Sequence, residues 1–184
     1  MNTHRQNSDA VIAQTKHLRL VERDGWSFVQ RIGNSGIVCI VATTADERLI
    51  LVEQYRPPVG KSVIELPAGL AGDLDDQPDE TFQQAAEREL LEETGYVAGN
   101  WTQIVTVASS AGLTDEVVTF FLAEGLERKT PGGGDASEDI RVHEVPMEDI
   151  QCWLKETATS GNLIDARVYA GLQFLSRRSE KEGG

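Results

Sequence analysis

The chain has 184 residues, of which 40% are hydrophobic and 26% are charged, and its formal net charge is −13 at pH 7. These values are typical of one globular domain with a substantial core, and the negative charge argues against a non-specific surface for nucleic acid or anionic membranes. Cys39 and Cys152 have neither metal-ligand spacing nor the pattern of a disulfide framework. No apolar signal region or membrane-spanning run is found, so we expect a cytoplasmic protein.

The first part of the chain has the pattern of antiparallel strands. Residues 1–12 are polar, and we expect no regular structure there. Apolar residues alternate over residues 15–32 around Asp24 and Gly25, a pair that favours a tight hairpin turn, so two antiparallel strands are predicted. Residues 37–43 are nearly all apolar, which indicates a strand buried on both faces. Residues 49–55 return as a further strand.

The rest of the chain alternates between helix and strand patterns. We expect an acidic loop over residues 69–79, followed by a helix over residues 79–94 with Asp79 as its N-cap and Gly95 as its C-terminal glycine. Strands are predicted over residues 101–108, 117–123 and 140–145. The glycine-rich segment 130–137 is interpreted as a hairpin tip, with a mobile lid as the alternative. Pro146 fits the first turn of a helix, and a last helix covers about residues 165–177. A layered α/β or α+β domain follows.

Three glutamates give the predicted long helix an unusual face. Glu89, Glu92 and Glu93 are spaced so that their carboxylates lie on one side of the helix. Adjacent anions destabilise a helix unless a cation lies among them, and hard divalent cations take carboxylate oxygens while keeping waters and substrate phosphates as further ligands. A solvated acidic face is the alternative interpretation. Arg88, placed to pair with one carboxylate, and the helix-ending Gly95 favour the metal site.

The same helix carries a long motif. Glu80, seven residues, then Arg88-Glu89-Leu90, one residue, Glu92-Glu93, one residue and Gly95 resembles the Nudix box, G-x5-E-x7-R-E-U-x-E-E-x-G-U, where U is a bulky aliphatic residue. Two positions depart from that pattern. Gly69, the match for the first glycine, lies eleven residues before Glu80, so the loop carries a five-residue insertion. Tyr96 replaces the final aliphatic residue.

Further segments resemble one branch of that family, the ADP-ribose and nucleoside diphosphate sugar pyrophosphatases. The segments read EQYRPP from Glu53, ELPAG from Glu65, SAGLTDE from Ser110, EDIRVH from Glu138 and GNLIDA from Gly161, and the resemblance extends over roughly residues 20–177. One departure concerns the substrate. The branch typically has proline after the serine of the downstream loop, whereas Ala111 stands there in this chain, which weakens the case for ADP-ribose relative to other nucleotide sugars.

The resemblance implies a fold and a metal site. The fold is an α/β protein of the Nudix type, an α/β/α sandwich with a mixed central sheet over residues 34–179. It is preceded by an N-terminal antiparallel β hairpin region over residues 1–33 and followed by a frayed tail over residues 180–184. Mg²⁺, or alternatively Mn²⁺, is the implied cofactor. The implied metal ligands are the Ala68 carbonyl and four carboxylates, with Glu89 and Glu93 foremost among Glu89, Glu92, Glu93 and Glu138.

The resemblance also implies roles in catalysis and substrate binding. Glu138 is the expected general base, with Asp139 and Asp135 as weaker candidates. Arg56 can bind a phosphate because guanidinium suits bidentate phosphate contacts, although a surface salt bridge is nearly as well supported. Glu116 is a candidate for holding the terminal sugar, with an ordinary loop anion as the alternative.

The N-terminal hairpin carries two aromatic residues with an implied role. In this branch such a hairpin often packs across a two-fold axis, and its aromatic residues enclose the base. Trp26 and Phe28 are the candidates; one of the two is expected in the core, and we favour Trp26 for the base because it follows the turn. A homodimer follows from the same resemblance, with no nucleic-acid or membrane partner.

The expected function is therefore Mg²⁺-dependent hydrolysis of the pyrophosphate bond in a nucleoside diphosphate sugar of the ADP-ribose, ADP-glucose or GDP-mannose class. The products are a nucleoside monophosphate and a sugar phosphate. Dinucleoside polyphosphates are an alternative substrate. A catalytically silent Nudix-fold module that binds a nucleotide sugar is the alternative function, although a pure binding module has little need for three clustered carboxylates.

Overall fold

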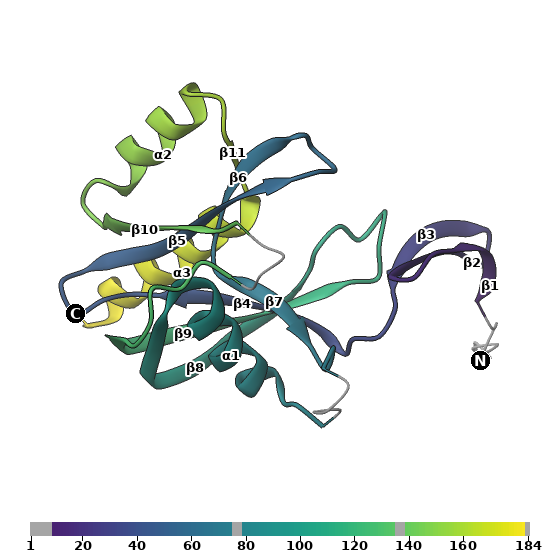
Figure 1. Cartoon of the computed structure of the whole chain (residues 1–184), viewed down its shortest axis with the longest axis horizontal. Coiled ribbons are helices and arrows are strands. Elements are labelled where there is room, and N and C mark those ends of the chain that lie inside the picture. Colours follow the sequence, from purple (N-terminus) through teal and green to yellow (C-terminus); the bar gives the residue numbers. More distant parts are fainter. Residues whose placement is uncertain (1–8, 75–78, 135–138, 183–184) are drawn as a thin grey trace.

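The computed structural model describes residues 9–74, 79–134 and 139–182 (Figure 1). Its helices are α1 (Phe82–Thr94), α2 (Ile150–Thr159) and α3 (Ala166–Glu182). Its strands are β1 (Ala10–Gln14), β2 (Leu18–Arg23), β3 (Trp26–Arg31), β4 (Gly36–Ala42), β5 (Arg48–Arg56), β6 (Lys61–Glu65), β7 (Ala68–Ala71), β8 (Tyr96–Ala108), β9 (Val117–Arg128), β10 (Arg141–Pro146) and β11 (Leu163–Ile164).

Two mixed sheets form the body of the molecule. One has the strand order β7-β4-β9-β8, in which β4 and β9 run parallel, and the other has the order β10-β5-β6-β11, in which β6 and β11 run parallel. The remaining neighbours in both sheets are antiparallel. The predicted mixed sheet is therefore confirmed.

Strand β4 shows why the sheets are covered on both faces. Its side chains alternate between two cores, as expected for an apolar strand with helices on either side. Val38 and Ile40 pack in the core that contains Leu90 of α1, whereas Cys39 and Val41 pack in the core that contains α2 and α3. Figure 1 shows α1 and α3 associated with the same central strands. The α/β/α sandwich and the burial of residues 37–43 agree with the sequence prediction.

The N-cap of α1 lies two residues later than predicted. Thr81, not Asp79, is the N-cap, because the Thr81 side chain accepts from the Gln84 backbone N–H at 3.2 Å while the Gln84 side chain accepts from the Thr81 N–H at 2.9 Å. This reciprocal capping box satisfies two backbone donors together. Gly95 ends the helix as predicted, with a left-handed φ of 78° that glycine adopts without steric cost.

The glycine-rich segment is not a hairpin tip. It follows β9, which pairs with β4 and β8, and it precedes β10, which pairs with β5, so the flanking strands lie in different sheets. Its described part caps the end of α1, because Gly133 N–H donates to the Glu93 carbonyl at 2.8 Å and Gly134 N–H donates to the Glu92 carbonyl at 3.0 Å. These carbonyls have no partner within a helix that ends there.

Two further predictions were wrong. The N-terminal region has three antiparallel strands rather than two, because β1, whose first three residues were expected to lack regular structure, pairs with β2. Pro146 ends β10 instead of opening a helix, and α2 begins at Ile150 after Asp149. Proline fits the end of an edge strand, where its missing N–H costs no ladder bond. The predicted turn at Asp24 and Gly25 is present, and both residues have positive φ.

The sheet β1-β2-β3, hereafter the N-terminal sheet, stands apart from the two larger sheets at one end of the long axis (Figure 1). It is joined to them by the loop between β8 and β9, since Val29 N–H donates to the Leu113 carbonyl at 2.8 Å and Trp26 Nε1 donates to the Gly112 carbonyl at 3.3 Å. None of the helices in the described part of the chain is long and apolar enough to cross a membrane.

Candidate functional site

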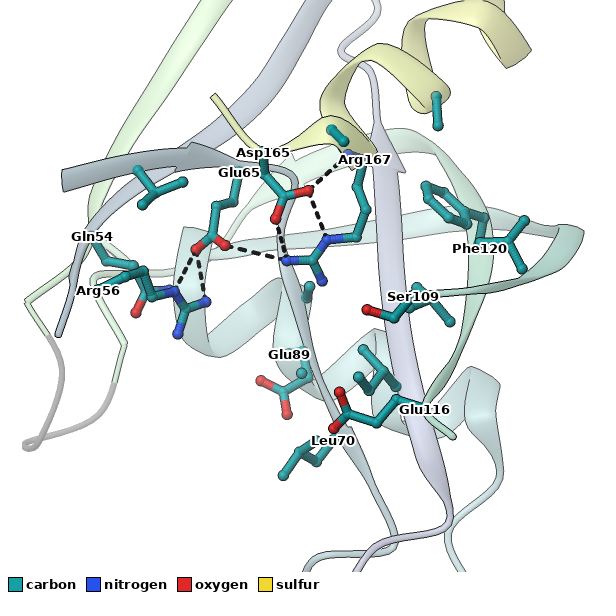
Figure 2. A pocket seen from close by; sticks show the side chains of 18 of the residues that line it. Gln54, Arg56, Glu65, Leu70, Glu89, Ser109, Glu116, Phe120, Asp165 and Arg167 are labelled. Carbon is teal, nitrogen blue, oxygen red and sulfur yellow. Dashed lines mark hydrogen bonds and ion pairs between the residues drawn. The ribbon is translucent and has the colours of Figure 1, made fainter. Parts of the chain in front are cut away.

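A cavity of about 880 Å³ opens where the ends of several elements meet. Its walls come from the strands β3 to β9, from α1, from β11 and from the start of α3, and Figure 2 shows side chains around it. Six carboxylates line this cavity together with three guanidinium groups. The carboxylates belong to Glu65, Asp73, Glu89, Glu93, Glu116 and Asp165, and the guanidinium groups to Arg31, Arg56 and Arg167. An anionic ligand therefore requires additional positive charge, which divalent cations supply.

Helix α1 and the start of β7 bring together three of the predicted metal ligands. Glu93 is 3% exposed, and its Oε2 accepts a hydrogen bond from the Ala68 N–H at 3.0 Å. Glu89 lies against Gly69, where a Cβ atom would be 1.9 Å from the Glu89 carboxyl carbon. The glycine is thus required for the carboxylate to occupy this place. Ala68, Glu89 and Glu93 all line the cavity.

The environment of Glu89 suits a cation. Burial raises the pKa of Glu89 to about 7, although the neighbouring Arg88 guanidinium acts in the opposite direction. A divalent cation would favour the ionised form. No three His, Cys, Asp or Glu side chains within the described ranges are arranged to hold a metal ion. Two carboxylates and a carbonyl nevertheless fit Mg²⁺, which usually keeps several waters and takes substrate phosphates as ligands.

Arg88 holds the acidic face of α1 in place. Its guanidinium donates to Glu80 at 2.9 Å, to Glu89 at 2.8 Å and to Glu92 at 3.2 Å, and also to the Leu70 carbonyl at 2.9 Å. The predicted pairing of Arg88 with a carboxylate of the helix is therefore present, and an arginine held in this way can orient a metal ligand without binding the metal. Glu92 is half exposed beside Arg88 and does not line the cavity.

Glu80 is part of the same network. Its side chain is buried, and it accepts from Arg88 and from the Gly72 N–H at 3.2 Å. The hydrogen bond from Arg88 lowers the pKa of Glu80, although its burial opposes the shift. Glu80 does not line the cavity, so its position is that of a partner of Arg88 that fastens the loop before α1.

The predicted phosphate ligand Arg56 belongs to a chain of ionic contacts along one wall of the cavity (Figure 2). Arg56 Nε and Nη2 approach Glu65 Oε2 at 2.8 and 2.7 Å. Glu65 Oε1 accepts from Arg167 Nη2 at 3.2 Å, and Arg167 pairs with Asp165 at 2.7 Å. Since the Glu65 side chain is 6% exposed, the contact of Arg56 is not an ordinary surface salt bridge.

In this wall, burial and the neighbouring arginines shift the pKa values of the carboxyl groups in opposite directions. Burial raises the pKa of Glu65, although Arg56 and Arg167 both oppose the shift. Burial would also raise the pKa of Asp165, but the hydrogen bonds from Arg167 outweigh it, and the pKa of Asp165 is lowered. Sequence reasoning gave Glu65, Asp165 and Arg167 no role. The ELPAG and GNLIDA segments contain the two carboxylates, and Asp165 is only two residues from Arg167, but the contact of Glu65 with Arg167 depends on the pairing of β6 with β11.

A second ionic contact joins the N-terminal sheet to the cavity. Arg31 Nε donates to Glu116 Oε1 at 2.7 Å, and both residues line the cavity. Glu116 was a predicted substrate ligand, whereas Arg31 was not identified. Its position at the end of β3 gave no signal, because the contact depends on the docking of the loop between β8 and β9 onto that strand.

Trp26, Phe28 and Asp139 do not line the cavity. Trp26 is 62% exposed on the N-terminal sheet, and Phe28 is 8% exposed beneath the Arg23 guanidinium, so the expectation that one of them is core agrees with the structure. Neither lines the cavity. Glu138 and Asp135 lie outside the described residues. Asp139 is exposed and does not line the cavity.

Comparison with known proteins gives consistent matches. The family model of the NUDIX domain matches residues 34–168. The ADP-ribose pyrophosphatase of Bacillus subtilis is 35% identical over 78% of this chain and 74% of its own length. The methanol dehydrogenase activator of Bacillus methanolicus is 30% identical over 78% of this chain and 74% of its own length. The GDP-mannose pyrophosphatase of Salmonella arizonae is 30% identical over 77% of this chain and 73% of its own length.

A solved structure, described as the crystal structure of ADP compounds hydrolase, has the same fold. It superimposes with a TM-score of 0.65, covers 96% of this chain and 94% of the matched chain, and is 22% identical in sequence.

Proposed function

We propose that this chain, which belongs to the Nudix family and resembles its ADP-ribose pyrophosphatase branch, hydrolyses the pyrophosphate bond of a nucleoside diphosphate sugar with Mg²⁺ as its cofactor. The products are a nucleoside monophosphate and a sugar phosphate. One observation carries the proposal: Glu89, Glu93 and Ala68 meet at the wall of a cavity that also contains Arg56. Metal-binding groups and a phosphate-binding cation thus face one space.

The residues divide the chemistry between them. Mg²⁺, or Mn²⁺ in its place, would be held by Glu89, Glu93 and the Ala68 carbonyl, and it supplies charge neutralisation at the phosphates and a more acidic bound water. Arg56 binds a phosphate oxygen from the opposite side of the cavity. Glu116, held by Arg31 at 2.7 Å, accepts a hydrogen bond from a sugar hydroxyl. Glu92 contributes through Arg88 or through a bridging water.

Glu138 is the proposed general base and a further metal ligand. The proposal rests on the EDIRVH segment and on the approach of the preceding residues to α1, where Gly133 and Gly134 bind the Glu93 and Glu92 carbonyls. A mutation pair tests it. Glu138→Gln should lower kcat by about 10²-fold or more, as expected for loss of a general base. If Glu138→Gln keeps near-full turnover while Glu116→Gln loses several orders of magnitude, the base is misassigned.

The substrate class is tested by a panel. ADP-ribose, ADP-glucose, GDP-mannose, UDP-glucose and diadenosine polyphosphates are incubated with the protein and a phosphatase, with and without Mg²⁺. We expect phosphate release from one or more nucleoside diphosphate sugars only when Mg²⁺ is present. Preference for diadenosine polyphosphates would favour the alternative substrate, and no release from any compound would favour a binding module.

We further propose a homodimer formed through residues 1–33, ahead of a catalytic domain over residues 34–179. The N-terminal sheet exposes large apolar side chains, as surfaces that bind other proteins often do. They include Val11, Ile12, Leu18, Leu20 and Trp26. In such a dimer Trp26 could stack on the base of the partner's substrate. A monomeric mass by light scattering at micromolar concentration would contradict this arrangement.

A further inference from the structure

One wall of the cavity is a continuous chain of alternating charges (Figure 2). Asp165 binds Arg167 through both of its carboxylate oxygens, at 2.9 Å to Nε and 2.7 Å to Nη2. Arg167 Nη2 also donates to Glu65 Oε1 at 3.2 Å. The other Glu65 oxygen accepts from Arg56. Each group therefore constrains the next, from Asp165 at one end to Arg56 at the other.

The inner end of this chain is fixed to the backbone. The Asp165 N–H donates to the Ile64 carbonyl at 2.9 Å, and Asp165 Oδ1 accepts from the Arg167 N–H at 2.7 Å. Ile64 directly precedes Glu65 at the end of β6, where β6 pairs with β11. Asp165 thus binds Arg167 at both its backbone and its side chain, and Asp165 is itself hydrogen-bonded to β6, the strand that carries Glu65.

The outer end is free to bind a ligand. The Arg56 side chain is 41% exposed, whereas the Glu65 side chain beneath it is 6% exposed. Nε and Nη2 of Arg56 both approach the same Glu65 oxygen, and within the described part of the chain Nη1 has no partner. In Figure 2, Glu89 lies across the open space from Arg56 and Arg167.

The position of Arg56 depends on how Glu65 is held. A buried carboxylate with donors on both oxygens has its plane fixed, and Arg56 in turn is fixed by one of those oxygens. If the donor on Glu65 Oε1 is lost, that oxygen is left buried without a charged partner, and the carboxylate turns toward Arg56 or water to regain one. The free edge of Arg56 then changes direction.

We propose that Arg167 is a positioning residue for substrate binding: acting through Glu65, it holds Arg56 with its free edge toward a phosphate of a nucleoside diphosphate. This deepens the proposed function and rests on it for the class of ligand. The proposal gives a role in substrate binding to Arg167, whose charge two carboxylates already neutralise. It predicts that the effects of Arg167 and Arg56 substitutions on affinity depend on each other.

A double-mutant cycle tests this dependence, because residues that act through one another give non-additive effects. The probe is α,β-methylene ADP, a diphosphate with an uncleavable bridge, titrated in the presence of Mg²⁺ by calorimetry. Arg56→Ala should weaken binding by about 10- to 150-fold, since a charge-assisted hydrogen bond contributes about 1.5–3 kcal/mol. Arg167→Lys keeps the positive charge but loses the planar guanidinium that can bind two carboxylates at once. It should weaken binding by about three- to tenfold.

The double variant decides the result. We expect Arg56→Ala with Arg167→Lys to bind as Arg56→Ala alone does, within about twofold. Arg128→Lys is the matched control, because Arg128 pairs with Glu144 at 3.2 Å and does not line the cavity; its affinity should equal that of the wild type. Glu65→Gln serves where Arg167→Lys does not fold, since one amide oxygen cannot accept from both arginines in the same way, and it should show the same coupling to Arg56→Ala.

Three outcomes would overturn the inference: additive losses in the cycle, an unchanged affinity in Arg167→Lys, or no binding of the probe by the wild type. The proposed function fails separately. If the cycle shows coupling but the wild type hydrolyses no diphosphate compound, then Arg167 positions Arg56 in a binding module rather than in an enzyme.

Discussion

Gly69 offers a direct test of the metal site, because a single methyl group added there reaches the Glu89 carboxylate. In Gly69→Ala the new Cβ would lie 1.9 Å from Glu89 Cδ and 2.0 Å from Oε1. Ordinary contacts between carbon atoms are about 3.5–4.0 Å. The carboxylate must therefore move by about 1.5 Å or more, or the strand must shift by a similar distance.

A displacement of that size should strongly reduce metal-dependent catalysis but have little effect on the stability of the fold. Mg²⁺ requires oxygen ligands at about 2.0–2.1 Å, and a misplacement of about 1 Å can lower a reaction rate by about 10²-fold. The obstructing group is the end of a flexible side chain, and Gly69 does not have a positive φ. We expect Gly69→Ala to lose about 10²-fold or more in kcat/KM, while its free energy of unfolding changes by less than about 1 kcal/mol.

The assay pairs hydrolysis at saturating Mg²⁺ with urea unfolding. Gly99→Ala is the matched control, because Gly99 also lies in a strand and a Cβ there meets nothing closer than 3.7 Å. Its activity should stay within about twofold of the wild type. If Gly69→Ala retains more than half of the wild-type activity, the Glu89 carboxylate does not bind the catalytic metal from this position.

Four further predictions concern protonation and stability. Because burial raises the pKa of Glu89 to about 7, Mg²⁺ must displace a proton at lower pH; affinity for Mg²⁺ by calorimetry should rise as pH increases through about 7, and a pH-independent affinity would contradict this. Between pH 4.5, the ordinary pKa of a glutamate, and about pH 7, Glu89 of the metal-free protein is protonated when folded and ionised when unfolded. Its contribution to the free energy of unfolding should therefore fall as pH rises through that window. If the free energy of unfolding instead rises there, and the rise disappears in Glu89→Gln, the assignment is refuted. Thr81→Ala removes the capping box of α1 and should cost about 1 kcal/mol in urea unfolding, whereas an unchanged midpoint would show that the cap is unimportant. Gly95→Ala combines a φ of 78° with a Cβ 2.0 Å from the Thr130 carbonyl oxygen, so its loss should exceed the roughly 1–2 kcal/mol of left-handed backbone alone; a smaller loss would mean that the 130–134 segment moves aside freely.

Local patterns predicted the parts of the fold that local chemistry controls. Residues 37–42 are all apolar because β4 is covered by α1 on one face and by α3 on the other. Gly95 ends α1 because the chain needs a positive φ there. The start of α1 was misplaced, since Asp79 and Thr81 are both good caps and the choice depends on the partner at the third helical position, Gln84.

The candidate site was only partly predictable for a different reason. Glu89, Glu93 and Arg88 occupy fixed places on one helix, so their spacing alone brings them together. Glu65 reaches Arg167 only through the tertiary pairing of β6 with β11, and Arg31 reaches Glu116 only because β3 docks onto a distant loop. Such contacts have no periodicity or spacing in the sequence. Glu92 was predicted to share a helical face with Glu89 and Glu93, yet it does not line the cavity. Spacing along a helix therefore does not by itself show which residues reach a site.

The identity of the bond that is broken tests the central claim most directly. The protein is incubated with Mg²⁺ and ADP-ribose or GDP-mannose in water enriched in ¹⁸O, and the products are identified by mass spectrometry. Hydrolysis of the pyrophosphate bond predicts equal amounts of nucleoside monophosphate and sugar phosphate, with one ¹⁸O atom in one of the two phosphates, and no products from Glu93→Gln. Release of a nucleoside diphosphate and a free sugar, or equal turnover by Glu93→Gln, would contradict the account.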